Sequence, residues 1–184
     1  TLAALAALAY VLATAFHEHA GHAAACVALG GSPSKLGAFY VECDYGAMGA
    51  AGVRLVSSAG PVASLLLGLL SARWLRSART PSARLFWWLM ASVGLMTAFG
   101  YLLFSAVSGI GDLGTGDDGA LKGVPVPWLW RVAMGAVGYW LYDRSVVWSM
   151  TALTGVVGGR EDRAARVRRT ALVCYIAGAA ACIA

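Results

Sequence analysis

Three histidines and one glutamate lie within six residues near the start of the chain, where residues 17–22 read HEHAGH. The stretch from Thr1 to Gly30 contains no other charged side chain. Because an ionisable group within a membrane helix costs roughly 2.5–3.5 kcal/mol, such a cluster needs a compensating interaction. Zinc binds His nitrogens and carboxylate oxygens, and a catalytic zinc site holds three protein ligands plus a water. The cluster therefore predicts a zinc centre, with Glu18 as the base that takes a proton from the water.

The spacing of the outer two histidines is unusual for a helical metal motif. In H-E-x-x-H the histidines are four residues apart and share one helix face. His17 and His22 are five apart, which separates them by about 140° on a regular helix. A π-bulge with one extra residue would bring them together, and we favour it because π-bulges are frequent at functional sites. In the alternative, His19 and His22 form the pair on one face, and Glu18 is a ligand instead of the base.

A glycine-rich segment further along the chain supplies carboxylates. Residues 108–119 read SGIGDLGTGDDG and contain Asp112, Asp117 and Asp118. No Lys-Ser/Thr pair follows these glycines, so a phosphate-binding loop is not predicted. Asp112 is nearest the preceding apolar run and is expected to reach deepest, whereas the other two are expected to form a solvated turn. Asp112 is therefore the predicted third ligand, and Asp118 is the alternative.

The composition places these residues in a membrane protein. The chain is 59% hydrophobic and 12% charged, against about 25% charged in soluble proteins. The net charge of +5 comes from arginines that flank apolar runs without interleaved aromatics, so no nucleic-acid partner is expected. By length, residues 1–184 form a single domain. The cluster in the first apolar run is not typical of a cleaved signal peptide.

The four cysteines do not form a recognisable framework. Cys26, Cys43, Cys174 and Cys182 contain no C-x-x-C pair, and three of them lie in apolar runs. Neither a disulfide framework nor a zinc knuckle is therefore predicted.

Apolar runs indicate the elements that must position the cluster, since roughly 20 apolar residues span a bilayer. The runs are Leu2–Leu29, Val53–Leu75, Leu85–Val107, Val126–Val157 and Thr170–Ala184. The second is expected to be interrupted at Ser57–Pro61. The fourth contains Asp143-Arg144, which either pair or mark a bend. The predicted fold class is an all-α polytopic membrane helical bundle of about 5–6 transmembrane helices, with residues 1–119 as the core and residues 126–184 as accessory helices.

A short β element is expected after the first helix. Residues Lys35–Gly46 contain β-branched and aromatic side chains with partial alternation, which predicts a strand or β-hairpin, with an ordered loop as the alternative. The open edge of such a strand could hold an extended peptide by main-chain pairing.

Two arginine-rich stretches fix an orientation in the membrane. Arg73–Arg84 and Arg160–Arg169 are expected in the cytoplasm by the positive-inside rule. The first span then runs outward, and the spans alternate from there. Consequently the histidine cluster and the aspartate loop after the third span lie toward the same, non-cytoplasmic side, which supports a shared site independently of the motif.

Three segments together resemble the site-2 protease family of intramembrane zinc metalloproteases. His17-Glu18 with His22 resembles the family's His-Glu pair and second histidine, although the H-E-x-x-x-H spacing is similar to that of dipeptidyl-peptidase III. Residues 59–64, AGPVAS, resemble the family's A-G-P-x-x-N stretch with Ser64 in place of Asn. Gly111-Asp112 or Asp118-Gly119 resembles the element that brings the third ligand. The resemblance covers residues 1–119.

The resemblance implies an enzyme that hydrolyses a peptide bond in or near a membrane-spanning protein substrate. Zinc would be held by His17, His22 and Asp112, with Glu18 as the base. His19 is an accessory residue that could donate to the oxyanion, orient Glu18 or face the interior. The alternatives are a zinc-dependent membrane hydrolase of lipid amides or esters, a haem- or metal-binding membrane protein with two axial histidines, and a structural role.

Overall fold

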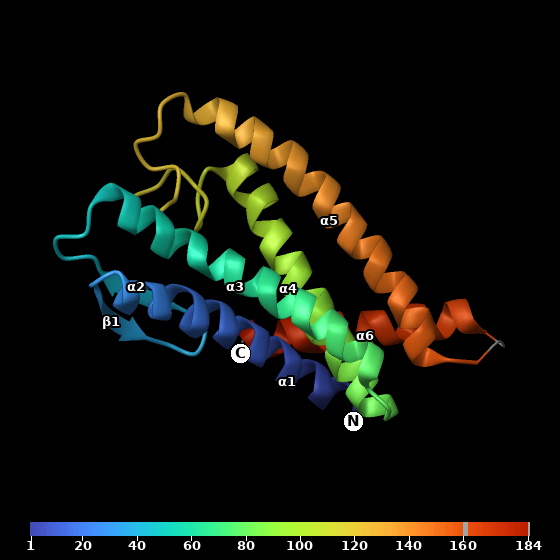
Figure 1. Ribbon diagram of the computed structural model, residues 1–184. Coiled ribbons are helices and arrows are strands. Elements are labelled where there is room, and N and C mark those ends of the chain that lie inside the picture. Colours follow the sequence, from blue (N-terminus) through green and yellow to red (C-terminus); the bar gives the residue numbers. More distant parts are fainter. Residues whose placement is uncertain (160–161, 184) are drawn as a thin grey trace.

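The protein is an elongated bundle of helices with one small β-hairpin near one end (Figure 1). The computed structural model describes residues 1–159 and 162–183. In chain order the elements are α1 (Leu2–Ala15), η1 (Phe16–Ala23), α2 (Ala24–Ala28), β1 (Ser32–Leu36), β2 (Val41–Asp44), α3 (Ala50–Ser77), α4 (Pro81–Ser108), α5 (Pro127–Val157) and α6 (Arg163–Ile183).

The first helix is continuous but changes its winding at the histidine cluster. α1 passes directly into η1, a π-helix, and η1 passes into α2. A π-helical turn contains more residues than an α-helical turn, so side chains five positions apart face the same side. The Nε2 atoms of His17 and His22 are accordingly 3.3 Å apart. This confirms the predicted π-bulge and rules out regular α-helical winding through the cluster.

A two-stranded antiparallel hairpin follows the first helix, as predicted. β1 pairs with β2 in a register that runs from Ser32 opposite Asp44 to Leu36 opposite Val41. The backbone N–H of Gly37 donates to the carbonyl of Tyr40 over 2.9 Å and closes the turn. The hairpin begins three residues earlier than the predicted segment, at Ser32.

A disulfide between Cys26 and Cys43 ties the hairpin to the first helix, with their Cα atoms 6.0 Å apart. No disulfide framework was predicted from the sequence, and this bond corrects that prediction for one pair of cysteines. The two residues are 17 positions apart, on α2 and β2. Only the hairpin folding back along the helix brings them within bonding range, and sequence spacing does not show that fold. Cys174 and Cys182 are free thiols.

α3 runs through Pro61 without a break, so the predicted interruption at Ser57–Pro61 is wrong. A proline removes one backbone N–H, and a helix tolerates this when its neighbours enclose the freed carbonyl. Pro61 is buried against the rest of the bundle. Nearby, a Cβ added at Gly94 of α4 would lie 2.8 Å from the Gly68 nitrogen of α3, so glycine at these positions permits the close approach of the two helices.

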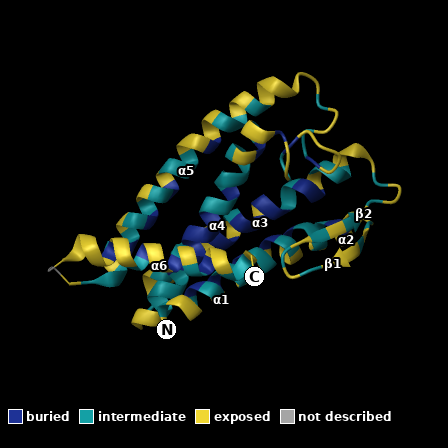
Figure 2. Cartoon of the chain, turned by 180° about the vertical axis from the view of Figure 1, so that it is seen from behind, coloured by how far each residue is buried: buried dark blue, intermediate teal, exposed yellow. Residues whose placement is uncertain are grey.

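The largest buried cluster lies where α1, α4, α5 and α6 meet, and α1 contributes only small alanines to its fully buried part. Trp88, Leu89 and Leu153 have no exposed area there. The indole N–H of Trp88 donates to the carbonyl of Ser149 over 2.8 Å and links α4 to α5. Buried residues face the inside of the bundle, and exposed residues cover the outer face of α5 (Figure 2).

Three helical segments of the described chain are long and apolar enough to cross a membrane: Leu2–Ala28, Ala50–Ser77 and Pro81–Ser108. On α5, Asp143 and Arg144 form an ion pair while the helix continues, so they pair and do not mark a bend. α6 begins at Arg163, within the stretch Arg160–Arg169 that was predicted as a basic loop. That prediction is wrong for residues 163–169, which form the first turns of the helix. Arg160 and Glu161 lie outside the described residues.

Candidate metal centre

His17, His22 and Asp112 come together at one point between the first helix and the loop after α4, and each offers one ligand atom. Nε2 of His17 lies 3.1 Å and Nε2 of His22 lies 3.3 Å from Oδ2 of Asp112. With the two histidine Nε2 atoms 3.3 Å apart, the three ligand atoms form a nearly equilateral triangle.

The triangle has the dimensions of one face of a zinc coordination sphere. Ligand atoms about 2.0–2.2 Å from a tetrahedral zinc lie about 3.3–3.6 Å from one another. The observed separations of 3.1–3.3 Å are close to this range. Two imidazole nitrogens and one carboxylate oxygen are also a donor set that zinc accepts, and three protein ligands leave a fourth position for water or substrate.

Each imidazole is oriented by a hydrogen bond at its other nitrogen. The Nδ1–H of His22 donates to the carbonyl of Val56 over 2.9 Å; because a carbonyl only accepts, the neutral ring keeps a free lone pair on Nε2. Nδ1 of His17 lies 2.9 Å from the hydroxyl of Ser64, which is buried. Partners of this kind fix the ring orientation and raise the basicity of metal-binding histidines.

Glycines let η1 and α3 cross in contact beside the triangle. A Cβ added at Gly21 would lie 2.6 Å from the Cα of Gly60. A Cβ added at Gly60 would lie 2.6 Å from Nε2 of His17 and would also collide with Nε2 of His22. Such a methyl group would enter the space onto which the ligand atoms converge. The hydrogen at Gly60 therefore keeps open a space that an alanine would fill.

Asp112 reaches the histidines because the chain turns back after α4. Gly109 ends α4 with a φ of 77°, and Gly111 has a φ of 82°, a left-handed conformation that favours glycine. Burial alone would raise the pKa of the Asp112 carboxyl, but its interactions with His17 and His22 outweigh that effect and hold the pKa below its usual value. Asp112 thus offers a carboxyl oxygen beside the two imidazole nitrogens.

The other two aspartates of the loop lie away from the triangle. Asp117 is 95% exposed and pairs with Lys122. Asp118 is also exposed; its carbonyl accepts a hydrogen bond from the Ser57 hydroxyl, and it lines the neighbouring pocket. The structure thus brings Asp112, and neither of these two, into the ligand triangle.

Glu18 lies beside the triangle in a pocket of about 230 Å³. The hairpin and the residues at its ends line the same pocket through Tyr40, Val41 and Cys43. Glu18 therefore lines a pocket together with two of the candidate ligands, His22 and Asp112, and is not one of the three. A base in this position could accept a proton from a water next to the ligands.

His19 is exposed and, among the described residues, belongs neither to the triangle nor to the lining of the pocket. Sequence reasoning missed Tyr101, whose ring stacks on His17 with centroids 5.0 Å apart. It also missed the carbonyl of Val56 as a partner of His22, because a backbone group carries no sequence signal. Ser64 was identified only as a departure from a motif, whereas the structure gives it a contact with His17.

No protein-family model, curated protein or solved structure matches this chain. What the site can do chemically is therefore argued from its own atoms.

Proposed function

We propose that this protein is an intramembrane zinc metalloprotease similar to the site-2 proteases. The observation that carries the proposal is the π-helical turn, which aims His17 and His22 at Asp112 and leaves Glu18 in the pocket alongside. Zinc-dependent hydrolases use a set of this kind: two imidazoles and one carboxylate as metal ligands, and a nearby glutamate that does not bind the metal.

His17, His22 and Asp112 would hold the zinc. When bound, zinc would supply Lewis acidity, which polarises a carbonyl and lowers the pKa of a water. Glu18 accepts a proton from the attacking water as the new C–O bond forms. It then delivers that proton to the amide nitrogen as the C–N bond breaks, so that the products are a carboxylate and an amine. Ser64 and the Val56 carbonyl hold the imidazole rings in place.

The substrate we propose is a membrane-spanning or membrane-adjacent protein segment. α1 to α4 contain the three apolar segments of sufficient length, and α5 and α6 complete a multi-pass bundle in the lipid bilayer. A substrate helix would have to unwind before attack, because helical carbonyls are already hydrogen-bonded. The strand β2 borders the pocket and has one open edge, where an extended peptide could pair.

The disulfide is consistent with the proposed orientation. The arginine-rich ends of α3, α4 and α6 lie in the cytoplasm in this proposal. Cys26 and Cys43 are then on the opposite side, together with the candidate metal centre. Disulfides persist in oxidising compartments and are rare in the cytosol, so this pair belongs on the non-cytoplasmic side.

The ligand geometry disfavours the haem alternative. Axial histidines lie on opposite faces of a porphyrin. The Nε2 atoms of His17 and His22 are only 3.3 Å apart, with ring planes at 75°, and the Asp112 carboxylate lies within 3.3 Å of both. This arrangement leaves no room for a macrocycle between the rings.

The test is Glu18→Gln, which keeps the size of the side chain and removes its basicity. The variant should retain zinc at the wild-type stoichiometry, while cleavage of a membrane-spanning reporter panel should fall by about 10²–10⁴-fold. His19→Gln is the matched control, because His19 is exposed outside the site, and it should keep both properties. Zinc content is measured by elemental analysis and cleavage by mass spectrometry on the same preparation. Loss of zinc from Glu18→Gln would make Glu18 a ligand, and undiminished cleavage would place the base elsewhere.

A further inference from the structure

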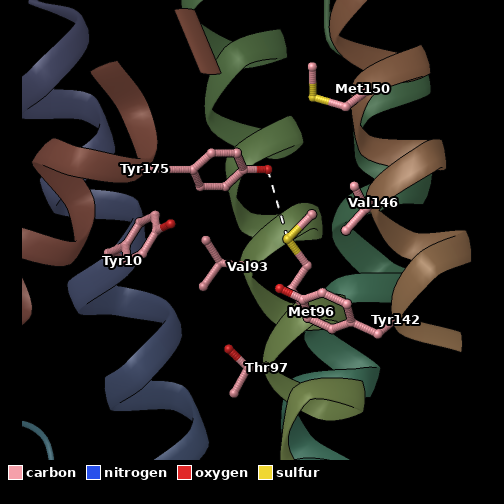
Figure 3. A pocket seen from close by; sticks show the side chains of 8 residues that line it. All are labelled: Tyr10, Val93, Met96, Thr97, Tyr142, Val146, Met150 and Tyr175. Atoms are coloured by element: carbon pink, nitrogen blue, oxygen red, sulfur yellow. Dashed lines mark hydrogen bonds between the residues drawn. The ribbon is translucent and has the colours of Figure 1, made fainter. Parts of the chain in front are cut away.

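A second cavity lies away from the metal centre, between α1, α4, α5 and α6 (Figure 3). Its volume is about 400 Å³, and it shares no lining residue with the pocket that contains Glu18. Cavities that bind small molecules typically measure roughly 300–1,000 Å³. The cavity is therefore large enough for a ligand of its own.

Tyrosine hydroxyl groups from three helices face this cavity. Tyr10 comes from α1, Tyr142 from α5 and Tyr175 from α6, and they reach toward α4 from different sides (Figure 3). The Tyr175 hydroxyl bonds to the Ser149 hydroxyl over 3.2 Å and to the sulfur of Met96 over 3.9 Å. Within the described residues, the hydroxyls of Tyr10 and Tyr142 have no such partner. Two hydrogen-bond donors without a partner among the described residues thus line the same open cavity.

The chemistry of the lining restricts what could fill this volume. A hydroxyl without a hydrogen bond is costly in apolar surroundings, so an occupant should offer oxygen atoms that accept from Tyr10 and Tyr142. None of the lining residues is Lys, Arg, His, Asp or Glu, so a charged headgroup would find no counter-ion. Val93, Met96 and the tyrosine rings form the remaining walls, and such groups pack against an apolar or flat conjugated body.

We propose that this cavity binds one molecule of an uncharged membrane lipid whose head carries carbonyl oxygens, which accept hydrogen bonds from Tyr10 and Tyr142. An isoprenoid quinone and a diacylglycerol both have this chemistry, and the experiment below distinguishes them. The site includes neither the candidate metal ligands nor Glu18, so this proposal can be tested independently of the proposed protease function.

Binding is tested with the full chain in phosphatidylcholine nanodiscs, titrated separately with decylubiquinone and dioctanoylglycerol. Native mass spectrometry then counts the bound molecules per chain. Wild-type protein should saturate at one molecule of one of these two probes, and that probe identifies the source. The double variant Tyr10→Phe/Tyr142→Phe should bind it about 25-fold more weakly, at about fivefold for each hydroxyl.

Tyr139→Phe is the matched control, because Tyr139 also lies on α5 but is 70% exposed and does not line the cavity. It should bind as the wild type does. Met96→Trp should fill the cavity and abolish binding while the metal content stays unchanged. Failure of the wild type to saturate with either probe, or equal affinity in the double phenylalanine variant, would overturn the proposal.

Discussion

The polar atoms of the candidate metal centre and those of the tyrosine-lined cavity differ in how they are hydrogen-bonded. At the metal centre, Nδ1 of each imidazole has a hydrogen-bond partner, and only the ligand atoms of His17, His22 and Asp112 are turned toward one point. At the second cavity the charged residues are missing from the lining, and the hydroxyls of Tyr10 and Tyr142 lack partners within the described chain. A triangle of two imidazole nitrogens and one carboxyl oxygen suits a cation, whereas neutral donors on apolar walls suit an uncharged molecule.

The two regions also differ in how tightly their helices pack. At the metal centre, glycines bring two helix backbones into contact, so a single added methyl group has nowhere to go. Around the second cavity, side chains from four helices meet over a larger volume, and methionine can change its rotamer to fill gaps. We therefore expect substitutions at the candidate metal centre to have large and specific effects on metal binding, and substitutions near the second cavity to leave metal binding unchanged.

Gly60→Ala should have the largest effect. Its methyl group would occupy the space beside Nε2 of His17 and His22, so bound zinc should fall to a background level, and overpacking should cost about 1–3 kcal/mol of stability. Elemental analysis and thermal unfolding measure the two effects. Gly49→Ala, at the N-terminal cap of the same helix with open space around it, should keep wild-type zinc. Full zinc occupancy in Gly60→Ala would mean that the metal lies elsewhere.

Removal of the carboxylate tests the third ligand. Asp112→Ala should weaken zinc binding by more than about 100-fold. Loss of a residue that only hydrogen-bonds to a ligand costs up to about 100-fold, and loss of a ligand itself should cost more. Asp117→Ala and Asp118→Ala should retain zinc, since both residues are exposed outside the triangle. Competition with a fluorescent chelator gives the affinities. If only Asp118→Ala lost zinc, Asp118 and not Asp112 would be the third ligand.

Ser64→Ala should have an intermediate effect. It removes the hydroxyl that lies 2.9 Å from Nδ1 of His17, and loss of such a partner typically weakens metal binding 10–100-fold. The control is Ser71→Ala on the same helix, because the Ser71 hydroxyl is buried without a hydrogen-bond partner. The same chelator competition should show no change for Ser71→Ala. Equal zinc affinities for Ser64→Ala and Ser71→Ala would show that the Ser64 hydroxyl does not contribute to metal binding.

Ser149→Ala should have the smallest effect and sharpens the contrast between the two regions. The Ser149 hydroxyl bonds to the Ser92 hydroxyl over 2.6 Å and to Tyr175 over 3.2 Å. Hydrogen bonds between membrane helices contribute about 0.6 kcal/mol on average, so unfolding in mixed micelles should shift by about that amount. Zinc affinity should not change. A drop in zinc affinity would show that the two regions are energetically coupled.

The grouping of His17, His22 and Asp112 at the candidate metal centre was predictable in part because its signals are local. The five-residue spacing between His17 and His22, read against helix geometry, indicated the wide turn that η1 adopts. The position of Asp112, next to the end of an apolar run, indicated which aspartate reaches inward. Alternating β-branched and aromatic residues indicated the hairpin.

The missed features depend on how distant segments pack. The Cys26–Cys43 disulfide requires the hairpin to fold back along the first helix. The passage of α3 through Pro61 requires neighbouring helices to enclose the proline, which local propensity does not report. The second cavity combines residues from four helices, and each of its tyrosines, taken alone, reads as an ordinary interfacial side chain.

The disulfide also sets an order for the maturation of the protein. Cys43 lines the pocket of Glu18, and its bond to Cys26 holds the hairpin that forms one wall of that pocket. In the proposed orientation these cysteines oxidise only after the first helix has inserted and the hairpin has crossed the bilayer. The pocket wall is then fixed last, after translocation. In that orientation a newly synthesised chain would reach the membrane before this wall of the pocket is fixed by the disulfide.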